Sequence, residues 1–164
     1  MHRSIGVMVI AFLSCIVMAV SGLAADNPTE GDLAGGWRLH ADGSVFLSPK
    51  NAPKDIIWAI QLDGNHMRWT LVVIPQSGPP TFESYESDVG AAPVAVAGSP
   101  HKTSASVTLG TGNFTLKSTP SVGDLKAIST TCSLSGDKKQ MDCPGTATKA
   151  DGSSEKFDIK FDRM

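Results

Sequence analysis

Residues 56–73, IIWAIQLDGNHMRWTLVV, decide the fold class because they hold the clearest strand-turn-strand pattern in the chain. Apolar side chains occupy every second position before the polar DGN group, and they do so again after it. This alternation predicts two antiparallel strands that place their apolar side chains on one face. Such a hairpin has one buried and one exposed face, as expected for a sheet wrapped around a core.

The register of this hairpin depends on which two residues form its turn. If Asp63 and Gly64 form the turn, Trp58 lies opposite Trp69. If the turn lies one residue later, Ile60 lies opposite Trp69 instead. Both registers keep these apolar side chains on the same face, and the pattern alone leaves both open.

Short alternating segments follow one another along the rest of the chain. In residues 104–117, a loop at 110–113 pairs Leu109 with Phe114, and residues 155–163 alternate apolar with charged side chains. Residues 90–103 are rich in Ala, Gly and Pro, which predicts a long loop or an edge segment. Turn-forming pairs separate the segments at intervals typical of all-β folds. We therefore predict a single antiparallel β-barrel of about eight to ten strands, with a β-sandwich as the alternative.

The N-terminus has the layout of a secretory signal peptide. A short basic opening precedes an apolar stretch over residues 5–20, and small residues follow it up to Ala24, as is typical of a signal-peptidase site. The apolar stretch is shorter than the roughly 20 residues of a membrane-spanning helix. We predict a signal peptide at 1–24, a flexible lead-in at 25–32, a barrel domain at 33–164, and export to the periplasm or beyond.

Cleavage after residue 24 would leave two cysteines, Cys132 and Cys143, in the mature chain. They lie symmetrically about a turn, so that pairing them across a hairpin also pairs Leu134 with Met141. In an exported domain this arrangement predicts a structural disulfide. The chain has no C-x-x-C spacing and no histidine near either cysteine in sequence, which argues against a redox or metal-binding pair.

Charge and motifs argue against several functions. The chain carries 14 Lys and Arg against 16 Asp and Glu, a net charge of −2, and has no basic run, which argues against nucleic acid as a partner. We find no catalytic serine motif, dinucleotide loop or calcium loop. We therefore expect no enzyme, no cofactor, no metal and no membrane span in the mature chain. A hydrolase using a histidine or Glu86 and Asp88, which share a strand face with Phe82, is the weakest alternative.

Three tryptophans stand against a single tyrosine in the chain. Filling the core is the ordinary role of tryptophan, and we expect this role for Trp37. The inner wall of a small barrel can also line a ligand pocket. The candidate wall residues of such a pocket are Trp58, Ile60, Trp69, Leu71 and Phe82.

The Gly35-Gly36-Trp37 segment has a Gly-x-Trp pattern at the head of the first expected strand. It resembles the opening of lipocalin-like and avidin-like barrels. The resemblance implies that Trp37 plugs the closed end of a barrel beneath an arginine from a late strand. Arg163 is the candidate for that arginine, and Gly35 has a structural role in the motif.

A second resemblance extends over residues 33–163. It rests on the order of Trp37-Arg38-Leu39, the proline-containing stretch 93–100, the turn segment 133–138 and the aromatic strand 157–163. This order is similar to that of secreted bacterial lipocalin-like proteins of uncharacterised function. The resemblance implies a periplasmic barrel. It transfers no functional residues, because that family has no established activity.

These patterns lead to two hypotheses about function. The first is an exported, non-catalytic barrel that binds a small, mostly apolar ligand. The alternative is a protein-binding module such as a periplasmic protease inhibitor, because such inhibitors also combine a Gly-x-Trp barrel with one disulfide. A hollow barrel favours the first hypothesis, whereas a filled barrel with an exposed apolar patch favours the second.

Overall fold

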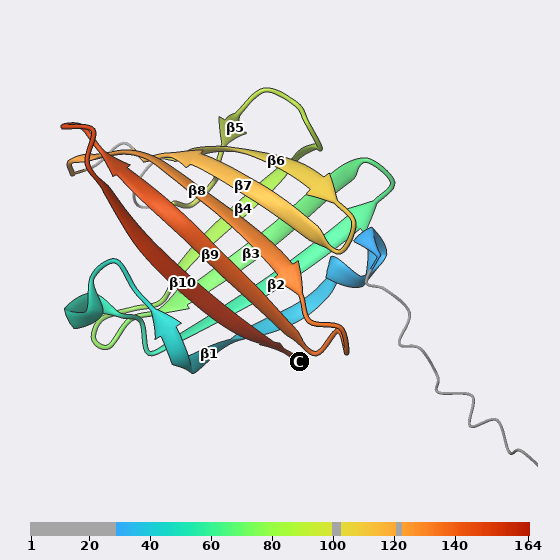
Figure 1. Cartoon of the computed structure of the whole chain (residues 1–164), viewed down its shortest axis with the longest axis horizontal. Coiled ribbons are helices and arrows are strands. Elements are labelled where there is room, and N and C mark those ends of the chain that lie inside the picture. Colours follow the sequence, from blue (N-terminus) through green and yellow to red (C-terminus); the bar gives the residue numbers. More distant parts are fainter. Residues whose placement is uncertain (1–28, 100–102, 121–122) are drawn as a thin grey trace, which may run out of the picture.

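The computed structural model describes residues 29–99, 103–120 and 123–164, which form one antiparallel sheet curled into a nearly closed barrel (Figure 1). Its ten strands lie in the order β4-β3-β2-β1-β10-β9-β8-β7-β6-β5. The last strand of the chain, β10, therefore pairs with the first, β1. The predicted all-β barrel is confirmed. The strands are β1 (Gly35–Val45), β2 (Asp55–Asp63), β3 (His66–Ile74), β4 (Thr81–Asp88), β5 (Val94–Ala95), β6 (Ser104–Gly110), β7 (Asn113–Thr119), β8 (Leu125–Leu134), β9 (Gln140–Lys149) and β10 (Ser154–Arg163).

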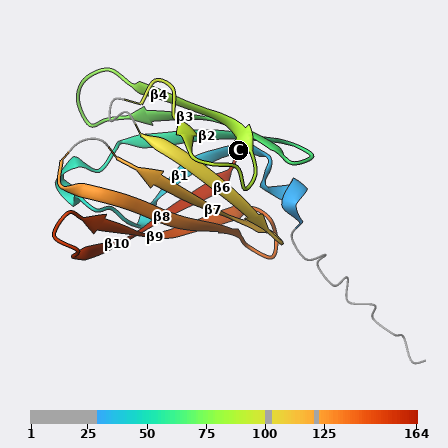
Figure 2. The same ribbon diagram turned by 90° about the horizontal axis from the view of Figure 1, so that it is seen from above.

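The hairpins have the registers that the alternation allows. Ile60 lies opposite Trp69 and Asp63 opposite His66, so Gly64 and Asn65 form the β2–β3 turn, the second of the two predicted registers. Leu109 pairs with Phe114 as predicted. Figure 2 shows β2, β3 and β4 as one wall of a flattened barrel and β7, β8, β9 and β10 as the other. The alternating apolar side chains of both walls therefore meet between them.

The seam between β4 and β5 is the weakest join in the barrel. Among the described residues, its backbone pairing is one isolated bridge, in which Ser84 and Ala97 exchange hydrogen bonds of 2.9 and 2.8 Å. The Gly90 N–H adds a bond to the Val107 carbonyl at 2.7 Å. Strand β5 has only two residues, within the stretch 90–103 that was predicted as a loop or an edge. Proline and glycine prevent this stretch from forming a continuous ladder.

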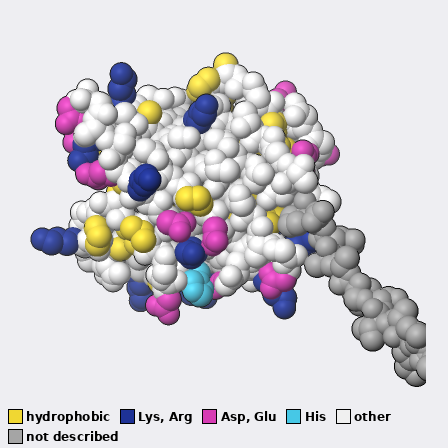
Figure 3. Space-filling model, viewed as in Figure 1, with side chains coloured by type: hydrophobic (Ala, Val, Ile, Leu, Met, Phe, Trp, Pro, Cys, Tyr) yellow, Lys and Arg dark blue, Asp and Glu magenta, His cyan; other side chains and the backbone are white. Residues whose placement is uncertain are grey.

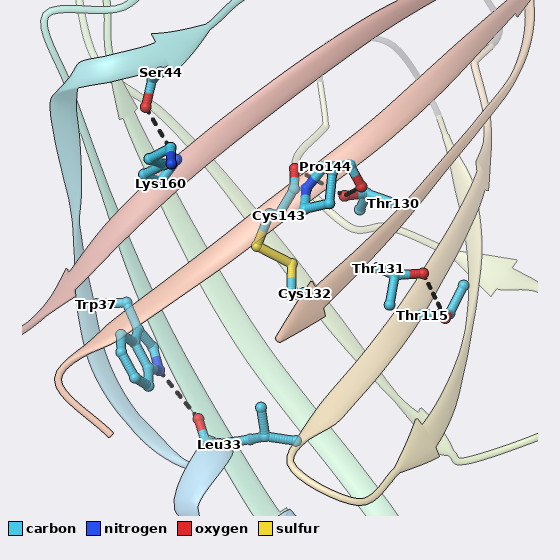
Figure 4. Close-up of a disulfide and its surroundings, with 10 residues drawn as sticks. All are labelled: Leu33, Trp37, Ser44, Thr115, Thr130, Thr131, Cys132, Cys143, Pro144 and Lys160. Carbon is cyan, nitrogen blue, oxygen red and sulfur yellow. Dashed lines mark hydrogen bonds between the residues drawn. A yellow bond between two sulfur atoms is a disulfide. The ribbon is translucent and has the colours of Figure 1, made fainter. Parts of the chain in front are cut away.

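A bulge in β1 turns the chain away from β10. The register between the two strands shifts between His40 and Val45, and such a bulge bends the strand that carries it. The Ser44 hydroxyl donates to the His40 carbonyl at 2.7 Å. It also accepts from the Lys160 N–H at 3.0 Å (Figure 4). Ser44 thus partners backbone groups that the interrupted ladder would leave unpaired, and the chain passes on to the 3-10 helix η2 (Pro49–Asn51).

The end of the barrel that holds the β2–β3 turn is closed by Trp37. This side chain is fully buried, and its indole N–H donates to the Leu33 carbonyl at 3.0 Å (Figure 4). The Arg163 guanidinium lies 4.3 Å from the centre of the indole ring and also donates to the carbonyls of Asp32 and Ala34. The contact between Trp37 and Arg163 has the geometry of a cation–π interaction.

Gly35 allows this close packing. Its φ is +137°, and a Cβ there would lie 2.9 Å from Arg163 Nη1. Leu33, which is also fully buried, ends the 3-10 helix η1 (Glu30–Leu33). The described part of the expected lead-in thus ends in a helical turn that closes the barrel. The predicted signal peptide, 1–24, lies outside the described residues.

The predicted disulfide between Cys132 and Cys143 is present and joins β8 to β9 (Figure 4). Both cysteines are buried, and Leu134 pairs with Met141 as the hairpin required. The bond lies on the inner face of the sheet, in the half of the β8–β9 hairpin nearer its turn.

Candidate functional site

The barrel is hollow between its two walls. A cavity of about 310 Å³ lies there, with a mostly apolar lining. One wall contributes Trp58, Trp69 and Leu71 from β2 and β3, and the other contributes Ile128, Phe157, Ile159 and Phe161 from β8 and β10. Its volume lies at the lower end of the range of about 300–1,000 Å³ that is usual for small-molecule sites.

Aromatic side chains form the floor of the cavity toward the closed end. Trp58 is at the centre, with ring-centre distances of 5.5 Å to both Phe114 and Phe161 and 6.1 Å to Trp69. Trp69 stacks on Tyr85 at 5.6 Å, and burial raises the pKa of the Tyr85 hydroxyl. Aromatic contacts of this kind stabilise a packed core beyond the area that they bury. The floor therefore separates the hollow part of the interior from the filled part.

The cavity adjoins a second hollow, here called the mouth, beneath the connection between β1 and β2. This hollow of about 340 Å³ is lined on one side by residues 46–53. On its other side are Ile56, Ile128, Phe157 and Ile159, which also line the interior cavity. The two spaces thus share a wall, and the connection that carries η2 forms the other side of the mouth. Figure 1 shows η2 and η1 at opposite ends of the barrel.

Glycine at position 145 shapes this mouth. Gly145 pairs with Phe157 across β9 and β10, and the Phe157 ring lies over it. A Cβ at Gly145 would lie 2.1 Å from Phe157 Cζ, which is far inside van der Waals contact. Only glycine therefore leaves room for the ring in its present position.

The interior has few polar groups. Glu83 projects inward from β4 and accepts a hydrogen bond from Ser99 Oγ at 3.1 Å. Thr130 also lines the cavity, but its hydroxyl lies 2.9 Å from the Pro144 carbonyl oxygen, to which it donates (Figure 4). Among the described residues that line the cavity, Glu83 is the only charged side chain.

The structure brings together three of the five predicted wall residues, Trp58, Trp69 and Leu71. Ile60 is buried, at 2% exposure, but it lies deeper and does not line the cavity. Phe82 is 60% exposed on the outside of the barrel. Its position follows from the pairing of Trp69 with Tyr85, which turns the odd-numbered residues of β4 inward.

Sequence reasoning missed Glu83 and the whole opposite wall. The alternation in residues 155–163 did place Phe157, Ile159 and Phe161 on one face. Their position opposite Trp58, however, depends on how the sheet closes, and the pattern within one strand carries no such information. For Glu83, the nearest signal was Tyr85, an aromatic residue two positions away on the same face, but Phe82 gives the other face of the strand an equal signal.

Glu86 and Asp88, the carboxylates of the weakest alternative, lie on the exposed outer face of β4. His66 Nε2 and Nδ1 lie 3.1 and 2.8 Å from their oxygens, and Arg68 Nε donates to Glu86 at 3.0 Å. Hydrogen bonds from His66 and Arg68 lower the pKa of Glu86. A general acid would need a raised pKa, so this cluster has the properties of a solvated ion-pair network.

Neither surface charge nor groups of metal-ligating side chains indicate a second site in the part of the chain that the structure describes. Figure 3 shows Lys and Arg interspersed with Asp and Glu on one face, with no large patch of either sign. Within residues 29–99, 103–120 and 123–164, no group of three or more His, Cys, Asp or Glu side chains is placed to hold a metal ion. A membrane-crossing helix is likewise not found in those residues.

Fold and cavity together define a class: a ten-stranded antiparallel barrel with an apolar interior cavity. No known family model matches the sequence. A search of curated proteins found no match either.

Solved structures with this fold are known. A REP1-NXSQ fatty acid transporter is 14% identical with a TM-score of 0.53, over 81% of this chain and 96% of that one. Rv2717c from M. tuberculosis is 12% identical with a TM-score of 0.54, over 81% and 93%. Secretory abundant heat soluble protein 4 from Ramazzottius varieornatus is 14% identical with a TM-score of 0.54, over 83% and 97%. At these identities the similarity establishes a shared fold.

Proposed function

We propose that the protein binds one small, mostly apolar molecule inside the barrel. The observation that carries the proposal is the apolar cavity of about 310 Å³ between Trp58, Trp69 and the β8–β10 wall. Filling such a space removes apolar surface from water, and each buried methylene contributes about 0.8 kcal/mol. A solved structure of similar fold is described as a fatty acid transporter, which agrees with an apolar ligand.

The hollow interior also bears on the alternative, a protein-binding module such as a protease inhibitor. That role does not need an internal cavity, because an inhibitor binds its target with surface loops. In this chain the interior is filled only toward the closed end, and the mouth adjoins the β1–β2 connection. The ligand-binding role therefore has the stronger support.

We further propose that the protein acts outside the cytoplasm, in the periplasm or beyond. The Cys132–Cys143 disulfide supports this location, because disulfides persist in oxidising compartments. The signal-like sequence before residue 25 supports it as well. Measuring the N-terminal residue of the protein recovered from the exported fraction tests both points, with Ala25 or Asp26 expected.

The binding role is tested by filling the cavity. Leu116 lines it, whereas its neighbour Lys117 is exposed on the outer face of β7. An apolar fluorescent probe should bind the wild-type protein and Lys117→Trp equally, and bind Leu116→Trp at least about tenfold more weakly. Circular dichroism and a cooperative melt establish that each variant is folded. Equal binding of the probe by folded Leu116→Trp would refute an interior site.

A further inference from the structure

The apolar cavity has one polar corner, where β4 meets the segment that closes the seam. Glu83 faces inward there, paired across the ladder with Leu71 of β3. Ser99 Oγ donates to Glu83 Oε1 at 3.1 Å, and Thr103 Oγ1 donates to Ser99 Oγ at 3.4 Å. All three side chains line the cavity. These three polar groups thus gather at one point of the wall, and Ser118 and Thr130 are the other polar residues among the described residues that line the cavity.

Gly98 brings Ser99 to this corner. Its φ is +74°, and a Cβ there would lie 2.3 Å from the Phe82 carbonyl oxygen. Only glycine allows the backbone of the closing segment to pass so near β4. The polar corner is therefore built into the path of the chain at the seam.

The carboxylate of Glu83 has unused capacity to accept hydrogen bonds. Oε1 accepts from Ser99, whereas Oε2 has no donor among the described residues. The described residues that line the cavity include no Lys, Arg or His. A carboxylate accepts about four hydrogen bonds when it is fully partnered, and an acceptor that loses water without gaining a donor is destabilised. A ligand that fills this cavity and supplies a donor would therefore complete the hydrogen bonds that the described residues leave open on Glu83.

We propose that Glu83 selects the polar end of the ligand, and that the cavity takes a small amphiphile ending in a hydrogen-bond donor, an ammonium or a hydroxyl, rather than a carboxylate. This inference rests on the proposed binding function and specifies its ligand. An ammonium donates charge-assisted hydrogen bonds to a carboxylate, and a hydroxyl donates a neutral one. A carboxylate ligand would place a like charge beside Glu83 in a space of low polarity, where repulsion is strong.

A matched series of ligands tests the selection. Decylamine, decanol and decanoic acid share one alkyl chain and compete with the bound fluorescent probe at neutral pH. The wild-type protein should bind the amine at least about tenfold more tightly than the acid, with the alcohol between them. Glu83→Gln should reduce the difference between amine and acid to about threefold or less.

Two controls distinguish an effect of Glu83 itself from an effect of the net charge of the protein. Glu86 is on the same strand but faces outward, so Glu86→Gln should keep the full preference for the amine. Leu116→Trp, with its cavity filled, should bind none of the three ligands well. If Glu86→Gln loses the preference as Glu83→Gln does, the net charge of the protein governs binding and the inference is wrong.

The outcomes distinguish this inference from the proposed function. If the probe binds but the acid competes as well as the amine, the cavity is a binding site and the selection by Glu83 is refuted. If neither the probe nor any of the three ligands binds, the binding function fails and the selection fails with it. The order of the three ligands by affinity for the wild-type protein tests the inference even if Glu83→Gln does not fold.

Discussion

The two ends of the barrel cover the same apolar interior in different ways. At the closed end, Leu33 and Trp37 are fully buried, and Arg163 lies across the indole ring. At the open end, Ile128 and Phe157 are only half-buried and border the cavity. Dense packing on one side of the aromatic floor thus supports an unfilled space on the other. We infer that the closed end stabilises the fold, while the open end borders the proposed binding site.

Removal of Trp37 should have the largest effect on the free energy of unfolding, and it tests whether the closed end stabilises the fold. Trp37→Ala should lower the free energy of unfolding by about 3–5 kcal/mol, the usual cost of truncating a buried tryptophan. It also leaves the Leu33 carbonyl without the indole donor. Urea unfolding measures the loss. The control is Leu71→Ala at the cavity wall, where the half-buried side chain borders an existing space. An equal loss in both variants would contradict the division of roles between the ends.

The disulfide should have the next largest effect. Replacing Cys132 and Cys143 together by alanine should lower the free energy of unfolding by about 2–3 kcal/mol, because the bond restricts the unfolded chain. The wild-type protein unfolded in a reducing agent should lose a similar amount, whereas the reducing agent should not alter the double variant. Unfolding curves of the wild type that coincide with and without the reducing agent would show that the bond does not stabilise the fold.

The contrast between Phe82 and Tyr85 shows how far the sequence could predict the structure. Alternation within residues 56–73 was enough to predict the β2–β3 hairpin, since one face is apolar throughout. In β4 each face carries an aromatic residue, so alternation alone does not tell which face is buried. The ladder with β3, which pairs Trp69 with Tyr85, decides it. Glu83 and Glu86 are chemically alike in the sequence and lie on opposite faces for the same reason.

The sequence also did not predict how far along the barrel axis each inner side chain lies. Ile60 and Trp58 both belong to the inner face of β2, yet only Trp58 reaches the cavity. Their difference depends on where the aromatic floor lies, and the floor combines side chains from several strands. The mouth beneath residues 46–53 was not predicted either, because this connection has no periodic pattern to indicate its path.

A smaller effect is expected at the open end from a single added methyl group. In Gly145→Ala the new Cβ would meet the Phe157 ring, whose Cζ lies 2.1 Å from its position. The ring must move, at a cost of about 1–3 kcal/mol typical of overpacking, and its displacement should change the affinity for the probe. Gly136→Ala is the matched control, since nothing lies within 4 Å of a Cβ there and no positive φ is required. Equal stability of the two variants would show that Phe157 is not held over Gly145.

The smallest effect should come from the charges outside the closed end. Hydrogen bonds to Asp88 and Glu86 raise the pKa of His66 above its ordinary value of 6.5, so the folded state favours the protonated ring. The resulting stabilisation is fully present below pH 6.5 and is lost as the pH rises through the folded-state pKa. Because both carboxylates are largely exposed and His66 is partly exposed, salt should screen the effect. NMR titration should find the pKa of His66 above 6.5 in the wild type and nearer to it in Asp88→Asn. A His66 pKa at or below 6.5 in the wild type would contradict the network.

If the pKa of His66 is raised while the stability in urea barely changes across this pH range, the buried packing around Trp37, rather than the ion pairs outside it, stabilises the closed end.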